Sequence, residues 1–219
     1  MKSANLLTSR YTTMFYESFN NDNQQLAIVN EQDNIIGSAV AKKIYYQGLL
    51  HRFASIFILD TQSRLLLQKR AFNKNRHAGL FSESVSAQVA YEEKYIDAAL
   101  RRINEEIGLV LDEHDASSGS RLTQVCKMNI DAKDEDYNYG FAGSIVSNSW
   151  RKNAFVTIYE CTLDDSTIEH LSINPYEISN VYFLSLDKVV EFFNSSPSLF
   201  VPGFGFTLKA YLNYYQSKR

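Results

Sequence analysis

Two arginines and two glutamates lie close together in the sequence ALRRINEEIGL, residues 99–109. In an α-helix, residues four positions apart lie on one face, so Arg101 can reach Glu105 and Arg102 can reach Glu106. The two glutamates themselves point about 100° apart around the helix axis. The pattern fits two exposed ion pairs, each stabilising a helix by roughly 0.2–0.5 kcal/mol. The alternative is a site that binds a metal ion and phosphate groups.

A helix over residues 94–107 is predicted to carry these four charges. Its apolar side chains recur every three or four residues and form one buried stripe: Ile96, Leu100, Ile103 and Ile107. Gly108 follows at the position where a glycine commonly ends a helix. The two glutamates flank the buried stripe rather than oppose it.

Residues 87–109, AQVAYEEKYIDAALRRINEEIGL, resemble the Nudix box, a pattern of glycine, glutamate and arginine residues at fixed spacing. Seven of the nine specified positions match without a gap: Glu93, Arg101, Ile103, Glu105, Glu106, Gly108 and Leu109. Two positions depart from the pattern. Ala87 stands in place of its first glycine, and Arg102 stands in place of the first glutamate of the helix.

The resemblance implies the Nudix fold, which is an α+β structure, an α/β/α sandwich with a mixed β-sheet. It implies that Glu105 and Glu106 are catalytic ligands of Mg²⁺ or Mn²⁺, and that Glu93 supports the loop or the metal. Arg101 would orient a glutamate, most simply Glu105. A hard divalent ion held by oxygen ligands neutralises phosphates and can position an attacking water. Because Arg102 removes one carboxylate, the resemblance does not extend to a full multi-metal hydrolytic site.

The arginine pair is similar to one branch of the Nudix fold, the type I isopentenyl-diphosphate isomerases, which have Arg-Arg at this place. The similarity extends upstream through residues 49–88. It implies a diphosphate clamp of four cations: Arg70, Lys74, Arg101 and Arg102. Arginine can bind phosphate oxygens bidentately, whereas lysine acts as a point charge. The resemblance also implies that His51 is a metal ligand, although a satisfied histidine at the start of a strand explains it equally well.

The catalytic groups of the isomerase branch are largely missing. Ser86 stands at its catalytic cysteine and Gln88 at a metal histidine, while a second metal histidine falls near Ile44 or Tyr45. The Glu-X-Glu pair of that branch falls on about residues 151–153, which read Arg-Lys-Asn. Allylic proton transfer needs an acid and a base on opposite sides of a short carbon unit. An unperturbed serine hydroxyl is a poor replacement for a thiol of tunable pKa. We therefore expect the phosphate clamp without the isomerase machinery.

These features predict a Mg²⁺- or Mn²⁺-dependent Nudix hydrolase that cleaves a small diphosphate-containing metabolite. The departures at Ala87 and Arg102 keep two alternatives open. One is an isomerase-like enzyme with altered catalytic groups, and the other is a non-catalytic diphosphate-binding module. A general base could come from Glu83 or Glu92, or from the acidic loop at residues 131–136, although carboxylates in such positions are more often simply solvated.

Composition limits the classes of partner. The chain has 219 residues with a net charge of −3, 45% hydrophobic and 21% charged, as is ordinary for a soluble globular protein. This balance offers no bulk electrostatic case for nucleic acid or an anionic membrane. The expected partner, a small-molecule diphosphate, is what the resemblance implies, and a homodimer is left open. The two cysteines, Cys126 and Cys161, have no metal-ligand spacing and favour a reducing cytoplasmic location. No apolar stretch approaches the length of a membrane span.

The remaining sequence predicts one domain at residues 25–219, preceded by an extension at residues 1–24. Strands are expected at residues 26–30, 35–42, 53–60, 65–70, 82–86, 121–130, 154–163 and 178–185. Further helices are expected at residues 185–196 and 207–218. Early hairpins followed by irregularly alternating strands and helices favour a mixed sheet flanked by a few helices.

Overall fold

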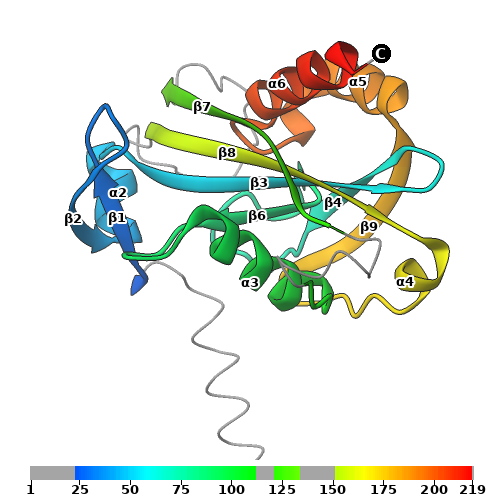
Figure 1. Ribbon diagram of the computed structural model, residues 1–219, viewed down its shortest axis with the longest axis horizontal. Coiled ribbons are helices and arrows are strands. Elements are labelled where there is room, and N and C mark those ends of the chain that lie inside the picture. Colours follow the sequence, from blue (N-terminus) through cyan, green and yellow to red (C-terminus); the bar gives the residue numbers. More distant parts are fainter. Residues whose placement is uncertain (1–22, 112–120, 134–150, 219) are drawn as a thin grey trace, which may run out of the picture.

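The computed structural model describes residues 23–111, 121–133 and 151–218. Within these residues, nine strands form one mixed sheet that is covered by helices on both faces (Figure 1). This arrangement confirms the predicted α+β sandwich. The predicted N-terminal extension lies almost wholly outside the described residues.

The sheet is organised around strand β3 (His51–Asp60). Strand β8 (Arg151–Leu163) pairs with β3 in parallel, in a register that runs from His51–Ala154 to Asp60–Leu163. Three other strands pair with β3 antiparallel: β1 (Gln25–Val29), β4 (Arg64–Arg70) and β6 (Val85–Gln88). The sheet is mixed because this pair is parallel whereas the other strand pairs are antiparallel. Residues that face each other across the parallel pair are about a hundred positions apart in the sequence.

The outer strands all pair antiparallel. Strand β2 (Ile35–Val40) pairs with β1, and β7 (Thr123–Lys133) pairs with β8. Strands β5 (Phe81–Ser82) and β9 (Ile178–Ser185) pair with β4. The register of β9 on β4 pairs Arg70 with Ile178, and this pairing brings the loop that precedes β9 to the end of β4.

The sheet has an apolar core on each face because successive side chains of a strand point to opposite sides. On β3, Ala54, Ile56 and Ile58 pack on one face, while Phe57 and Leu59 pack on the other. Both sets are buried, so this strand reads as one apolar run rather than as an alternation, as is usual for a strand covered on both faces. The prediction of a strong strand at this place is confirmed.

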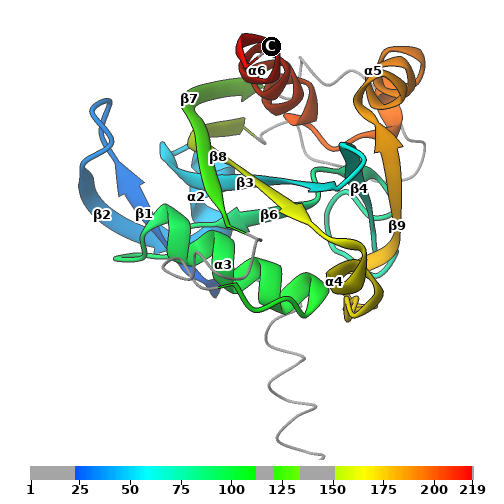
Figure 2. The ribbon, with the colours of Figure 1, turned by 45° about the vertical axis from the view of Figure 1, so that its right-hand side comes forward.

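Helix α3 (Tyr95–Ile107) covers one face of the sheet, and α5 (Leu186–Ser195) and α6 (Phe204–Ser217) cover the other (Figure 2). As expected, α3 buries Ile103 and Ile107, and it ends at Gly108, which adopts the left-handed conformation with φ 68°. Helix α6 begins three residues earlier than predicted, directly after the turn at Gly203.

Two short helices were not predicted: α2 (Ala41–Gln47) and α4 (Asp165–Glu169). The expected strand over residues 35–42 therefore ends at Val40. Gly48, with φ 62°, ends α2 by donating its backbone N–H to the last carbonyls of the helix, so this turn of helix is set by a glycine cap rather than by an apolar period. In the described part of the chain, no helix is long and apolar enough to cross a membrane.

Candidate functional site

Arg101 joins the loop before α3 to the helix itself. Its guanidinium donates to both carboxylate oxygens of Glu93, at 2.8 and 2.9 Å, and to the backbone carbonyl of Gln88 at 3.2 Å. The predicted contact with Glu105 is present but longer, at 3.4 Å. Burial opposes the charge of Arg101, but Glu93 and Glu105 outweigh it and hold the pKa of Arg101 above its usual value. Arg101 thus positions Glu93, with Glu105 as a secondary partner.

Arg102 lies at the centre of a buried ionic cluster. It donates through Nη1 to Glu105 at 2.8 Å and through Nη2 to both Glu106 and Glu177, the latter at 3.1 Å. Only 9% of the Arg102 side chain is exposed, and only 3% and 4% of the Glu106 and Glu177 side chains. The interpretation as two exposed ion pairs is therefore wrong for Arg102, because Arg102 and two of its three partners, Glu106 and Glu177, are buried and Glu177 comes from outside the helix.

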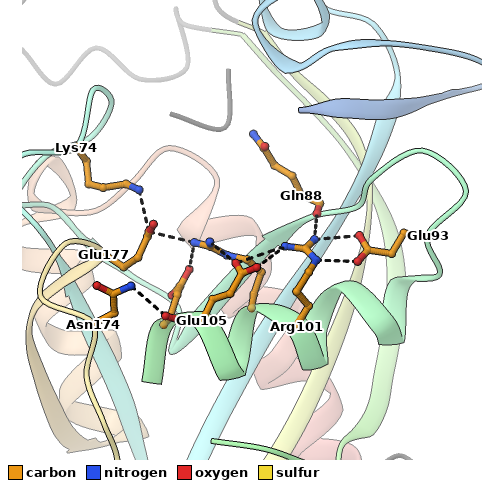
Figure 3. A network of polar contacts seen from close by, with 9 residues as sticks. Lys74, Gln88, Glu93, Arg101, Glu105, Asn174 and Glu177 are labelled. Carbon is orange, nitrogen blue, oxygen red and sulfur yellow. Dashed lines mark hydrogen bonds and ion pairs between the residues drawn. The ribbon is translucent and has the colours of Figure 1, made fainter. Parts of the chain in front are cut away.

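Glu177 is a member of the cluster that the sequence did not indicate. It precedes β9, and its carboxylate also accepts from Lys74 at 2.8 Å (Figure 3). A lone glutamate before a strand has no periodic signal. Only a prediction that β9 pairs with β4 could have placed it beside the cations, since the backbone N–H of Ala71 donates to the Glu177 carbonyl at 2.9 Å.

The loop that carries Glu177 is attached to the end of α3. The backbone N–H groups of Ser172 and Asn174 donate to the carbonyls of Ile107 and Glu106, each at 2.9 Å. The Asn174 side chain donates to the Glu105 carbonyl at 3.1 Å. These bonds satisfy carbonyls that the end of a helix leaves without partners. The same bonds hold the loop in register with the two helix glutamates.

Arg70 adds a third cation beside this cluster. Its Nη2 donates to the Arg76 carbonyl at 3.2 Å, and its buried Nε has no acceptor among the residues that the structure describes. Burial lowers the pKa of Arg70, an effect opposed by the charges of Glu106 and Glu177. The structure therefore brings three of the four predicted clamp residues together, Arg70, Lys74 and Arg102, and directs the fourth, Arg101, toward Glu93.

The two buried glutamates of this cluster, Glu106 and Glu177, differ in acidity. Burial raises the pKa of Glu106, although Arg102 opposes this shift. For Glu177, burial acts in the same direction, but Arg102 and Lys74 outweigh it and the pKa is lowered. The pKa of Arg102 is raised because Glu106, Glu177 and Glu105 together outweigh its burial. Glu177, next to two cations, therefore holds its charge more firmly than Glu106.

Glu105 and Glu106 have the chemistry that Mg²⁺ or Mn²⁺ requires, since carboxylate oxygens are hard ligands. Both carboxylates are nevertheless occupied by the Arg102 guanidinium. Across residues 23–111, 121–133 and 151–218, no three His, Cys, Asp or Glu side chains are arranged to hold a metal ion. The residues fit a divalent ion on condition that Arg102 first releases them.

His51 begins β3 and is fully buried. Its Nδ1 lies 2.9 Å from the Leu49 carbonyl, and its ring stands edge-on to Tyr45 with centroids 5.0 Å apart. The Gln88 side chain donates to the Tyr45 hydroxyl at 2.8 Å. Gln88 therefore connects the Tyr45–His51 pair to Arg101, which donates to the Gln88 carbonyl. The role of His51 as a metal ligand stays a prediction.

The candidates for a general base have different fates. Glu83 is fully buried, and its carboxylate accepts from Thr207, Ser82 and Ser55 at 2.6, 2.8 and 3.4 Å, so it joins α6 to the sheet and is not a solvated group. Glu92 is exposed, and its backbone has φ 65°. Most of the acidic loop, residues 134–136, lies outside the described residues.

Comparisons with known proteins identify relatives of this chain. An isopentenyl-diphosphate Delta-isomerase from Serratia proteamaculans is 44% identical over 95 residues, which are 43% of this chain and 53% of that protein, so the chain spans about half the length of this relative. An isopentenyl-diphosphate Delta-isomerase from Pectobacterium atrosepticum is 25% identical over 193 residues, covering 88% of this chain and 94% of that protein.

Solved structures show the same fold at low sequence identity. DR0079 from Deinococcus radiodurans has a TM-score of 0.63 and 18% identity, covering 85% of this chain and 98% of that one. The MutT protein from Methanosarcina mazei Go1 has a TM-score of 0.52 and 12% identity, covering 78% and 96%. The family described as NUDIX domain matches residues 49–202. This chain therefore belongs to the Nudix family, with a sequence resemblance to the isopentenyl-diphosphate isomerases within it.

Proposed function

We propose that this protein is a hydrolase that cleaves a small diphosphate-containing metabolite with the help of a divalent ion. The observation that supports this most directly is the cluster in which Arg102 joins the carboxylates of the Nudix helix to Glu177, with Lys74 paired to Glu177 and Arg70 beside them. Cations gathered in a buried site are costly unless a negative partner completes them. Glu105, Glu106 and Glu177 are these partners in the structure, and a diphosphate group would take their place when a divalent ion binds the helix carboxylates.

Each cation would have a distinct part in holding the diphosphate. Arg102 can bind two phosphate oxygens with its planar guanidinium, and Lys74 contributes a single charge. Arg70 has a buried Nε donor with no acceptor among the described residues, which suits a phosphate oxygen. Donors placed in this way before the reaction stabilise the charge that develops when water attacks phosphorus and the bridging oxygen leaves with the second phosphate.

Glu105 and Glu106 would hold the divalent ion. When bound, Mg²⁺ or Mn²⁺ supplies neutralisation of the phosphate oxygens and a more acidic water. Glu93 and Arg101 would act as positioning residues, since their two hydrogen bonds of 2.8 and 2.9 Å join the loop at residues 88–93 to α3.

The names of the sequence relatives favour a second candidate, isomerisation of isopentenyl diphosphate. Ser86 and Gln88 count against it, since they stand at the positions of a catalytic cysteine and a metal histidine in that branch. Both residues lie on β6, and the Gln88 amide already donates to Tyr45. A hydroxyl and a carboxamide do not replace a tunable thiol and an imidazole as proton donors and acceptors.

The test is a panel of nucleoside, sugar and prenyl diphosphates incubated with Mg²⁺ or Mn²⁺, with released phosphate and isomerised product measured in parallel. We expect phosphate release that falls by about 100-fold or more in Glu106→Gln, the size of loss seen when one group that stabilises developing charge is removed. Glu191→Gln is the matched control, because Glu191 is exposed on α5, on the opposite face of the sheet.

Two outcomes would reject hydrolysis. One is isomerised product that disappears in Ser86→Ala, and the other is phosphate release that is equal in the wild type and Glu106→Gln. Glu106 is buried against Arg102, so thermal unfolding of the variant must show that it is folded. Glu105→Gln provides a second variant at a more exposed position, with 38% of the Glu105 side chain accessible.

A further inference from the structure

We propose that Arg102 is an internal counter-ion of the carboxylate cluster, and that a diphosphate and a divalent ion enter the site cooperatively by drawing Arg102 from carboxylate to phosphate. The inference rests on the proposed function in one respect, since it takes this cluster as the site of diphosphate binding. It adds a reason for the arginine at the position where the Nudix pattern has a glutamate, and it assigns a role to Glu177.

The geometry places Arg102 where a shared cation would lie. Its two terminal nitrogens contact three carboxylates, two from its own helix and one from the loop before β9. A divalent ion that used Glu105 and Glu106 would compete with this guanidinium for the same oxygens. Metal binding without a substrate therefore has to break two ion pairs, one of which is buried.

The charges of the cluster are balanced before any ligand arrives. Three positive charges come from Arg70, Lys74 and Arg102. Three negative charges come from Glu105, Glu106 and Glu177. A diphosphate alone would add several negative charges to a buried neutral site, which is costly. A divalent ion alone would add positive charge. The two together preserve the balance most closely.

Exchange of partners is chemically reasonable for arginine. Its planar guanidinium binds carboxylate and phosphate with the same bidentate geometry, so phosphate oxygens can replace the carboxylate oxygens without a new kind of contact. Once phosphate holds Arg102, the oxygens of Glu105 and Glu106 become available to the ion. Because such coupling is reciprocal, the ion strengthens diphosphate binding by the same factor as diphosphate strengthens ion binding.

Glu177 sets how firmly Arg102 is held in the cluster. Its carboxylate bridges Arg102 and Lys74 at 3.1 and 2.8 Å, and its loop is attached to the end of α3 by backbone hydrogen bonds. In Glu177→Gln one negative charge is lost, so the positive charges of Arg102 and Lys74 are less neutralised by their neighbours. Glu177 acts as a positioning residue, and we expect it to weaken diphosphate binding in the absence of metal. The Glu177→Gln variant should therefore bind diphosphate more tightly than the wild type when no metal is present.

The test uses methylenediphosphonate, which is not hydrolysed, and isothermal titration calorimetry with and without Mg²⁺. Bound Mn²⁺ is counted by electron paramagnetic resonance with and without the diphosphonate. In the wild type we expect each ligand to strengthen the other by about tenfold or more, within the range of about 5–150-fold typical of coupled sites. In Glu177→Gln the factor should fall severalfold, while Glu191→Gln should match the wild type. Because Mg²⁺ and diphosphonate also associate in solution, and do so equally in all three samples, the comparison between variants isolates the protein's share.

Arg102→Gln gives an independent arm if Glu177→Gln does not fold. Without the guanidinium, the three carboxylates lose their shared cation, and we expect Mn²⁺ alone to bind severalfold more tightly than in the wild type. The unfolding temperature should then rise on addition of Mn²⁺, since a ligand that binds only the native state stabilises it.

The outcomes separate the inference from the proposed function. Diphosphonate that binds the wild type equally well with and without Mg²⁺ would overturn the inference and leave the proposed function in place. Mn²⁺ binding that is unchanged in Arg102→Gln would do the same. Absence of diphosphonate binding under every condition would reject the proposed function, and the inference with it.

Discussion

Two ionic clusters lie at opposite ends of helix α3, and they are built in opposite ways. Near its start, one carboxylate, Asp33 in the turn between β1 and β2, accepts from Arg52 at 2.8 Å, from the Tyr95 hydroxyl at 3.0 Å and from Lys127. Near its end, one guanidinium, that of Arg102, donates to three carboxylates. The first cluster contains more cations than carboxylates. The second contains equal numbers once Lys74 and Arg70 are counted with Arg102.

The surroundings explain what each cluster does. The cations around Asp33 also lie over an aromatic ring, with Arg52 5.3 Å and Lys127 4.8 Å from the centroid of Tyr95. These cation–π contacts stabilise the two positive charges in addition to the ion pairs with Asp33. They join the first hairpin to β3, α3 and β7, which makes the Asp33 cluster a structural connection. In the described part of the chain, the Nε donor of Arg70 beside the Arg102 cluster has no acceptor, which makes this cluster suited to exchange its partners with a ligand.

The largest expected effect separates the clusters by activity. Arg102→Gln should lower kcat/KM for diphosphate hydrolysis by about 100-fold, since it removes one fixed charge from the site. Asp33→Asn should leave kcat/KM within about threefold, because the partners of the Asp33 carboxylate among the described residues are Arg52, Tyr95 and Lys127, none of which belongs to the Arg102 cluster. Steady-state kinetics on folded variants checks both values, and an equal loss in the two would show that the distinction between the clusters is wrong.

The next effect concerns stability. Asp33→Asn should lower the free energy of unfolding by about 2–3 kcal/mol, because it leaves two cations without their shared carboxylate. Urea denaturation measures the change. Asp97→Asn is a suitable control, since Asp97 is exposed in the first turn of α3 and should contribute about 0.3–1 kcal/mol through the helix dipole. A control as damaging as Asp33→Asn would contradict the structural role.

The stabilisation by Asp33 should depend on pH in a defined direction. Burial opposes its charge, but hydrogen bonds from Lys127, Arg52 and Tyr95 outweigh burial and hold the pKa of Asp33 below its usual 3.8. A lowered folded-state pKa gives stability that is fully present above pH 3.8 and is lost as the pH falls through the folded-state value. The difference in unfolding free energy between the wild type and Asp33→Asn should therefore shrink only below about pH 4. A difference that shrinks near neutral pH would identify another group.

A smaller effect is expected where the Glu177 loop meets α3. Gly108 has φ 68°, and a Cβ there would lie 2.6 Å from the Cβ of Ser172. Gly108→Ala should cost about 1–2 kcal/mol for the left-handed backbone alone. It should also raise KM, because Ser172 belongs to the loop that presents Glu177. Gly37→Ala is the control, since a Cβ at Gly37 meets no atom within 4 Å. If Gly108→Ala is destabilised but its KM is unchanged, the loop that carries Ser172 and Glu177 does not contribute to substrate binding.

The smallest effect is expected for Lys127→Met. The Lys127 side chain is 38% exposed, so its ion pair with Asp33 is partly solvated and should contribute less than about 1 kcal/mol. Methionine preserves the hydrocarbon that lies over Tyr95. A loss as large as that of Asp33→Asn would show that Lys127, and not Arg52, is the main partner of Asp33.

Much of the fold could be predicted because its signals are local. The strands β3, β4, β8 and β9 are dense apolar runs, and α3 combines an apolar stripe with a terminal glycine. Helices α2 and α4 were missed because each is too short to show a period, and their ends depend on caps such as Gly48. The parallel pairing of β3 with β8 has no local signal, since it joins segments about a hundred positions apart.

The site divides along the same line. By itself, the sequence determined that Arg101, Arg102, Glu105 and Glu106 share one helix, because their spacing relative to the apolar stripe is a property of the helix alone. Only the tertiary structure decided that Arg102 is buried and that Glu177, 75 positions away, is its third carboxylate. The pairing of β9 with β4 and the hydrogen bonds at the end of α3 bring that loop into place. The physical reason is that helix spacing is set by neighbouring residues, whereas burial and charge balance depend on which distant segments pack together.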